Sequence, residues 1–242
     1  MEYRRLGASG LRVSPICLGT MMFGGRTSEK ASRAIISSAR DAGVNFIDTA
    51  NTYVKGESER ITGRAIKRHR HEWVLATKGG NPIGKGPNDR GLGAKNLHKA
   101  IDDSLQRLGP VFVDIYYFHL DDLDTPMEES ITAVTDIIRQ GKARYWGISN
   151  YTGWRAATLC SMAEAMGAPL PVACQPYYNA MNRTLEIDLL PACDYFGLGV
   201  VPYSPLARGV LTGKYTVGKK ADKGTRAGVK DSRMMETEFR PE

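Results

Sequence analysis

Seven short apolar runs, rich in β-branched and aromatic residues, limit the folds open to this chain more than any other feature. Segments with helical spacing separate them; Leu97, Ile101 and Leu105, for example, fall on one helical face. The runs are Ile16–Leu18, Asn45–Ile47, Trp73–Ala76, Val113–Phe118, Ala143–Ile148, Val172–Cys174 and Gly199–Pro202. Strands that alternate with helices, without a break in composition, predict a parallel sheet in one α/β domain over residues 1–242.

The length and the strand count together predict a barrel. A chain of 242 residues is close to the smallest (β/α)8 barrels. No eighth strand follows the seventh run, because the sequence turns polar from Lys219 to Glu242. The predicted fold is therefore a TIM-type (β/α)8 barrel whose eighth strand and helix are missing. Open edges at the first and seventh strands favour association with another copy of the chain.

Smaller signals refine this arrangement. Gly7 and Gly10, followed by the apolar Val13, predict a hairpin ahead of the first barrel strand, where it could plug the bottom of the barrel. Asn96 and the pair Thr125-Pro126 predict helix starts.

Composition narrows the class of protein. The net charge is +7, but the basic residues are scattered and not interleaved with aromatic ones, so we expect no nucleic-acid partner. No apolar run approaches the roughly 20 residues that cross a bilayer, and no export signal is found at the start. The four cysteines stand far apart without a CxxC pair. We therefore expect a cytoplasmic protein without a membrane partner or a metal site.

Polar residues end each run after the first, and in parallel barrels the site lies at these carboxyl ends. Taken singly they have structural explanations: His119 as a satisfied buried histidine, Lys78 as a loop cation, Tyr53 as a half-buried loop aromatic. Together they predict a ring of hydrogen-bonding and ionisable groups at one rim. The members are Asp48 with Tyr53 in the following loop, Lys78, His119, Ser149 with Asn150, Gln175, and Tyr203 with Ser204.

The same residues lie in motifs that resemble those of the aldo-keto reductases over essentially the whole length, from Tyr3 to Arg226. The matching stretches are Gly43–Tyr53, Ala76–Lys78, Asp114–His119, Gly141–Asn150, Gln175–Asn179 and Tyr203–Gly209. The pattern is most similar to the branch that includes potassium-channel β subunits and related bacterial reductases.

The resemblance implies a catalytic tetrad of Asp48, Tyr53, Lys78 and His119. Reduction of a carbonyl adds hydride to carbon and a proton to oxygen, and Tyr53 would donate that proton. A free tyrosine holds its proton too tightly to be an ideal acid near neutrality. An ammonium roughly 4 Å from the phenol oxygen stabilises its ionised form by about 4 kcal/mol at an effective dielectric constant of about 20, and Lys78 would supply this charge. Asp48 would keep Lys78 charged, and a neutral His119 would orient the carbonyl.

The resemblance also implies NADP(H) as cofactor and assigns its binding groups. Ser149, Asn150 and Gln175 would hold the nicotinamide carboxamide, and Tyr203 would stack on the ring. The remaining groups are Thr20, Met21 and Asp48 near the nicotinamide, Ser204, Leu206 and Arg208 around the pyrophosphate, and Lys214 and Arg226 as partners of anionic groups. NAD(H) stays an alternative, since the segment that holds the adenosine end in the family is not found here.

The main functional hypothesis is an NADP(H)-dependent oxidoreductase that reduces a small-molecule aldehyde or ketone. Two alternatives remain open: a cofactor-sensing regulatory subunit with slow turnover, and an inactive shortened form. The motifs do not distinguish among carbonyl substrates.

Overall fold

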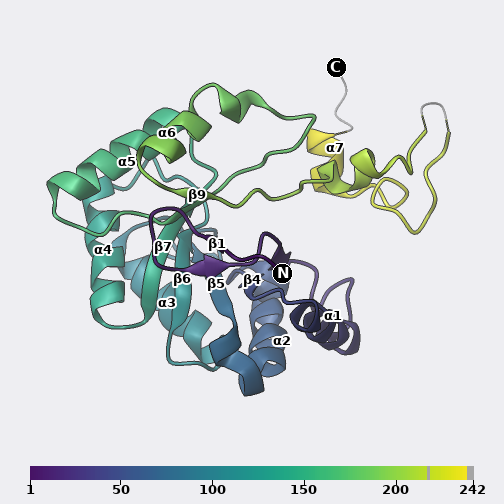
Figure 1. Cartoon of the computed structure of the whole chain (residues 1–242), viewed down its shortest axis with the longest axis horizontal. Coiled ribbons are helices and arrows are strands. Elements are labelled where there is room, and N and C mark those ends of the chain that lie inside the picture. The colour runs from purple at the N-terminus through teal and green to yellow at the C-terminus, as the bar shows by residue number, and fades with distance from the viewer. Residues whose placement is uncertain (217–218, 239–242) are drawn as a thin grey trace.

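The structure, a computed structural model, describes residues 1–216 and 219–238, and it consists of a curled parallel sheet with helices on its outer side (Figure 1). The strands are β1 (Arg4–Arg5), β2 (Arg12–Val13), β3 (Cys17–Gly19), β4 (Phe46–Asp48), β5 (Val74–Gly79), β6 (Val113–Phe118), β7 (Ala143–Ser149), β8 (Ala173–Gln175) and β9 (Gly199–Val200). The helices are α1 (Glu29–Asp41), α2 (Glu57–Ile66), α3 (Ala94–Leu108), α4 (Met127–Arg139), α5 (Gly153–Ala165), α6 (Leu189–Tyr195) and α7 (Ser232–Thr237).

The seven parallel strands pair in the order of the sequence, from β3 to β9. Within the described ranges no eighth parallel strand is present, and β3 and β9 form the two edges of the sheet. The predicted α/β architecture, a TIM-type barrel without its eighth strand and helix, is confirmed.

Alternation along the strands separates two layers of apolar side chains. Phe46, Ala76 and Tyr117 belong to the cluster inside the curl of the sheet, whereas Ile47 belongs to the larger cluster between sheet and helices. Because side chains alternate faces along a strand, Asp48 lies on the inner face with Phe46, and Lys78 lies there with Ala76. The two charged groups thus reach the same end of the barrel interior.

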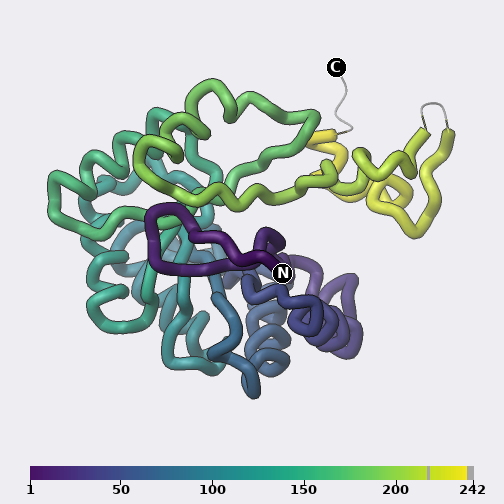
Figure 2. Tube along the Cα trace, in the orientation of Figure 1, coloured from purple at the N-terminus to yellow at the C-terminus, as the bar shows by residue number. Residues whose placement is uncertain are grey.

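The N-terminal hairpin of β1 and β2 closes the opposite end of the barrel. Leu6 and Val13 are buried in the inner cluster with Phe46 and Val74, which begin their strands. The hairpin loop crosses to the far edge of the sheet, where the Ala8 amide donates to the Gly197 carbonyl at 2.7 Å (Figure 2). The predicted hairpin and its position at the barrel bottom are confirmed.

Two helix starts test the signals predicted from the sequence. α4 begins directly after Pro126, as predicted. α3 begins at Ala94, so the predicted start at Asn96 is wrong: Asn96 lies inside the first turn, and its side-chain amide donates back to the Gly91 carbonyl at 2.8 Å. α2 and α3 approach closely at Gly63, where a Cβ would lie 1.9 Å from the Leu108 carbonyl oxygen. In the described part of the chain, no helix is long and apolar enough to span a membrane.

Candidate active site

A buried ion pair forms the centre of the site. The Lys78 ammonium at the end of β5 is fully buried and donates to Asp48 Oδ2 at 2.5 Å and to the Thr49 carbonyl at 2.9 Å. Burial alone lowers the pKa of Lys78, but the Asp48 carboxylate and the Tyr53 oxygen more than offset it, so the pKa of Lys78 is raised above its usual value. Lys78 is therefore charged at neutral pH although it has no exposed surface.

Tyr53 lies in a short turn between β4 and α2. Its hydroxyl oxygen is 3.2 Å from Lys78 Nζ, and the ammonium also lies 4.9 Å from the centre of the phenol ring. The turn places Val54 and Lys55 at φ of 48° and 54°, a backbone conformation that non-glycine residues rarely adopt. This turn places the Tyr53 side chain over the ion pair of Lys78 and Asp48.

His119 follows β6 and completes the group of four. Its ring packs edge-on against Tyr53, with centroids 5.7 Å apart and planes at 82°. Burial, followed by the charges of Lys78 and Arg233, lowers the pKa of His119 to about 3, so the imidazole is neutral. Among the described residues, neither His119 Nδ1 nor the second carboxylate oxygen of Asp48 has a hydrogen-bond partner. The site thus offers buried polar atoms whose hydrogen bonds remain to be made.

The side chains expected to hold the nicotinamide form a connected network on β7, β8 and the segment after β9. Ser149 Oγ donates to the Gln175 carbonyl at 2.7 Å. The Asn150 amide donates to the His119 carbonyl at 2.8 Å and accepts from the Tyr203 hydroxyl at 2.8 Å. The structure therefore brings this predicted set together and joins it to the tetrad through the backbone of His119.

Arg208 has an internal anionic partner. Its guanidinium donates to both oxygens of Glu238, at 2.6 and 2.9 Å, and to the hydroxyl of Thr237 at 2.7 Å. The Glu238 side chain is almost fully buried and also accepts from the Tyr177 hydroxyl at 2.5 Å. Arg208 is thus held by a carboxylate at the position where the resemblance predicts a phosphate contact.

The other predicted cofactor residues fall in three places. The Thr20 hydroxyl is buried and donates to the Asp48 carbonyl at 2.9 Å, so it holds the loop rather than facing the rim. Met21 and Arg226 line a cavity beside Tyr53. The remaining ones lie in the segment after β9: Ser204 at a positive φ of 53°, Leu206 with 55% of its surface exposed, and Lys214 beside Gly209.

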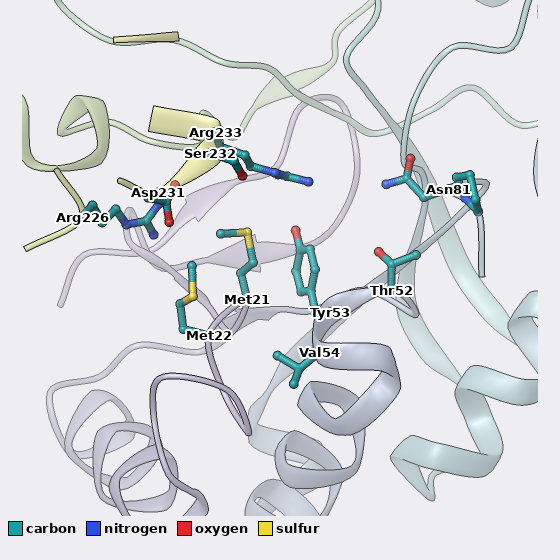
Figure 3. A pocket seen from close by; sticks show the side chains of 11 residues that line it. Met21, Met22, Thr52, Tyr53, Val54, Asn81, Arg226, Asp231, Ser232 and Arg233 are labelled. Carbon is teal, nitrogen blue, oxygen red and sulfur yellow. The ribbon is translucent and has the colours of Figure 1, made fainter. Parts of the chain in front are cut away.

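Three residues of the site were not singled out by sequence reasoning. Arg233 and Ser232, at the start of α7, line the cavity next to Tyr53 (Figure 3), and Glu238 at its end holds Arg208. α7 has only six residues, too few for a periodic apolar pattern. The one local signal is Asp231, which caps the helix by accepting from the Met234 amide at 3.2 Å.

Comparisons with known proteins agree with this geometry. Residues 15–237 match the model of the aldo/keto reductase family. A relative from Oryza sativa subsp. japonica, described as a probable voltage-gated potassium channel subunit beta, is 40% identical over 226 residues, which cover 90% of this chain and 68% of that protein. An uncharacterized oxidoreductase from Bacillus subtilis, YrpG, is 40% identical over 237 residues, which cover 93% of this chain and 72% of that protein. The chain belongs to the aldo/keto reductase family.

Proposed function

We propose that the chain reduces an aldehyde or ketone to an alcohol with NADP(H), and that Tyr53 donates the proton to the carbonyl oxygen. The observation that carries the proposal is the contact of the Tyr53 hydroxyl with the buried ammonium of Lys78, at 3.2 Å. Family membership supports oxidoreductase chemistry in general. The finer assignment depends on the arrangement of the four tetrad residues.

Each residue has a distinct part in the proposed step. As the proton leaves the Tyr53 hydroxyl for the carbonyl oxygen, negative charge develops on the phenol oxygen, and the Lys78 ammonium stabilises it. Asp48 keeps that ammonium charged in spite of its burial. His119 is neutral, so it can hydrogen-bond the substrate oxygen without adding a charge. When bound, the reduced nicotinamide supplies the hydride that the carbonyl carbon takes up.

The residues of the rim fit such a cofactor. In the described part of the chain, Asp48 Oδ1 and His119 Nδ1 are buried atoms without a hydrogen-bond partner. The buried side chain of Gln175 ends β8 directly beside Ser149 of β7, where a carboxamide could bind. The ring of Tyr203 lies beside Tyr177, with centroids 5.5 Å apart, and presents an aromatic surface next to this group. Arg208 would serve the pyrophosphate, and an anion there has to replace the carboxylate of Glu238.

The proposal is tested by titration with NADPH, followed as quenching of tryptophan fluorescence, and by turnover of a reactive aromatic aldehyde in the same sample. Tyr53→Phe should bind NADPH with unchanged affinity and lose at least 100-fold in kcat, since general acid catalysis contributes about 10²–10⁴-fold. Tyr195→Phe is the matched control, because Tyr195 is 83% exposed on α6. Equal turnover of Tyr53→Phe and the unaltered chain would refute the role of Tyr53.

The named relatives favour a second candidate function. The proteins from rice and Arabidopsis thaliana are both described as probable voltage-gated potassium channel subunits beta, and the latter is 39% identical over 225 residues. A regulatory subunit would bind the cofactor and use the same tetrad at a low rate. Tight binding of NADPH, with a kcat far below the 1–10³ s⁻¹ typical of enzymes, would favour this function.

A further inference from the structure

A cavity of about 590 Å³ opens directly beside Tyr53. One wall comes from the rim loops that carry Tyr53 and Asn81, and the other comes from the segment after β9, through Arg226 and Arg233 (Figure 3). The volume lies within the range of about 300–1,000 Å³ that is usual for small-molecule sites. Its position at the hydroxyl that would donate the proton identifies it as the place where a substrate can lie.

Arg233 gives this cavity a positive charge that no carboxylate of the described residues neutralises. Within residues 1–216 and 219–238, its guanidinium has no carboxylate partner and no side-chain hydrogen bond. Asp231 is the one acidic residue among the described lining residues, and Arg26 already pairs with it at 3.3 Å. The charge of Arg233 acts on the reacting groups, because it helps to lower the pKa of His119.

The placement of Arg233 points to the substrate and not to the nicotinamide. The groups predicted to hold and stack on the nicotinamide, Ser149, Asn150, Gln175 and Tyr203, form their own network outside the cavity wall. Of the residues predicted near the nicotinamide, Met21 alone lies in the described wall. In Figure 3 the Arg233 side chain runs toward the hydroxyl end of Tyr53, whereas Arg226 lies farther from that hydroxyl.

The rest of the wall suits a substrate with an apolar part. Met21, Met22 and Val54 provide apolar surface, and the amide of Asn81 adds a hydrogen-bonding group. An arginine presents a planar fork of donors that matches both oxygens of a carboxylate, and this pairing is stronger than a neutral hydrogen bond.

We propose that Arg233 binds a carboxylate group of the substrate, so that the chain prefers aldehydes and ketones that carry a carboxylate at the end opposite the reacting carbonyl. This inference rests on the proposed reductase function and names the substrate class for the same site. Arg233 sets specificity by holding the far end of the substrate while Tyr53 and His119 meet its carbonyl oxygen.

The test compares two substrates of nearly equal shape, para-carboxybenzaldehyde and the neutral para-carbamoylbenzaldehyde, with saturating NADPH. The unaltered chain should prefer the carboxylate, and Arg233→Met should reduce this preference in kcat/KM by about 10- to 100-fold, mainly through KM of the charged substrate. Arg233→Lys should restore part of the preference. Arg139→Met is the matched control, since Arg139 is 75% exposed on α4 and should keep the preference of the unaltered chain.

Two kinetic results would overturn the proposal. One is an unchanged preference in Arg233→Met, and the other is a parallel loss for both aldehydes together with weaker NADPH binding, which would assign Arg233 to the cofactor. Calorimetric binding of benzoate and of benzamide separates this inference from the proposed function. If the unaltered chain reduces neither aldehyde but binds benzoate in an Arg233-dependent manner, the reductase function fails and the carboxylate site stands. If benzoate binds equally to Arg233→Met, the carboxylate site fails.

Discussion

Replacing Asp48 with asparagine should destabilise the folded chain strongly, because it leaves the Lys78 ammonium buried without a counter-charge. Lys78 has no exposed surface, and its carboxylate partner lies 2.5 Å away. Removing one partner of a buried ion pair costs about 3–5 kcal/mol, a large fraction of the roughly 5–15 kcal/mol that stabilises a typical domain. We expect a loss of this size in the free energy of unfolding of Asp48→Asn at pH 7, measured by urea unfolding with tryptophan fluorescence.

The pH dependence gives a sharper signature of the same substitution. In the unaltered chain the folded pKa of Lys78 is raised, so its contribution to stability is complete below the unfolded pKa of about 10.4 and is lost as pH rises through the folded value. Without the carboxylate, burial dominates and the pKa of Lys78 falls below that unfolded value. The stability of Asp48→Asn should then increase as pH rises from 7 towards 10, so the deficit relative to the unaltered chain narrows.

Two further variants control for other causes. Asp136→Asn alters an exposed ion pair with Arg139, which is 3.6 Å long, and should cost less than about 1 kcal/mol. The double variant Asp48→Asn/Lys78→Met leaves no buried charge and should lose less stability than the sum of its two single variants. Additive losses, or a deficit of Asp48→Asn under 1 kcal/mol that does not change with pH, would refute the reasoning.

Three more predictions concern stability. The pKa of His119 is about 3 in the folded chain and about 6.5 in the unfolded chain, so its contribution to stability is complete above pH 6.5. This contribution falls by at most about 1.4 kcal/mol per pH unit as pH drops towards 3, and acid titration of unfolding should show a shallower loss of stability in His119→Gln. Arg107→Met should destabilise by about 3–5 kcal/mol, because Glu59 is fully buried and accepts from Arg107 at 2.5 Å; a loss under 1 kcal/mol in urea would contradict this. Gly63→Ala should cost about 1–3 kcal/mol, since the new Cβ would clash with the Leu108 carbonyl between α2 and α3, and an unchanged melting temperature would show that the helices can separate freely.

Much of the site was predictable from the sequence because one rule governs it. Parallel strands of a barrel end at one rim, so the polar residues that end them, such as Asp48 and Lys78, had to meet there. The network of Ser149, Asn150 and Tyr203 follows from the same rule. Membership of a known family then assigned a role to each position, and this assignment remains a prediction.

The parts that sequence reasoning missed depend on contacts without a local signal. Glu238 pairs with Arg208 across 30 residues of chain, and Arg233 enters the cavity from a short helix that follows an irregular segment. Asn96 misled because asparagine is favoured at helix starts, whereas Gly93, extended at φ −60° and ψ 145°, is the residue that precedes the helix. Tertiary packing decides such helix boundaries and pairings, and the propensities of single residues carry no information about it.

The N-terminal hairpin has a consequence for the order of folding. Each strand of the sheet pairs with its neighbour in the sequence, so the sheet can grow by successive short-range steps. The contact of Ala8 with Gly197 instead joins the two ends of the sheet across most of the chain. Closing so long a loop is entropically unfavourable until both ends are ordered. The hairpin should therefore dock late, and substitutions in it should accelerate unfolding while leaving the rate of folding almost unchanged.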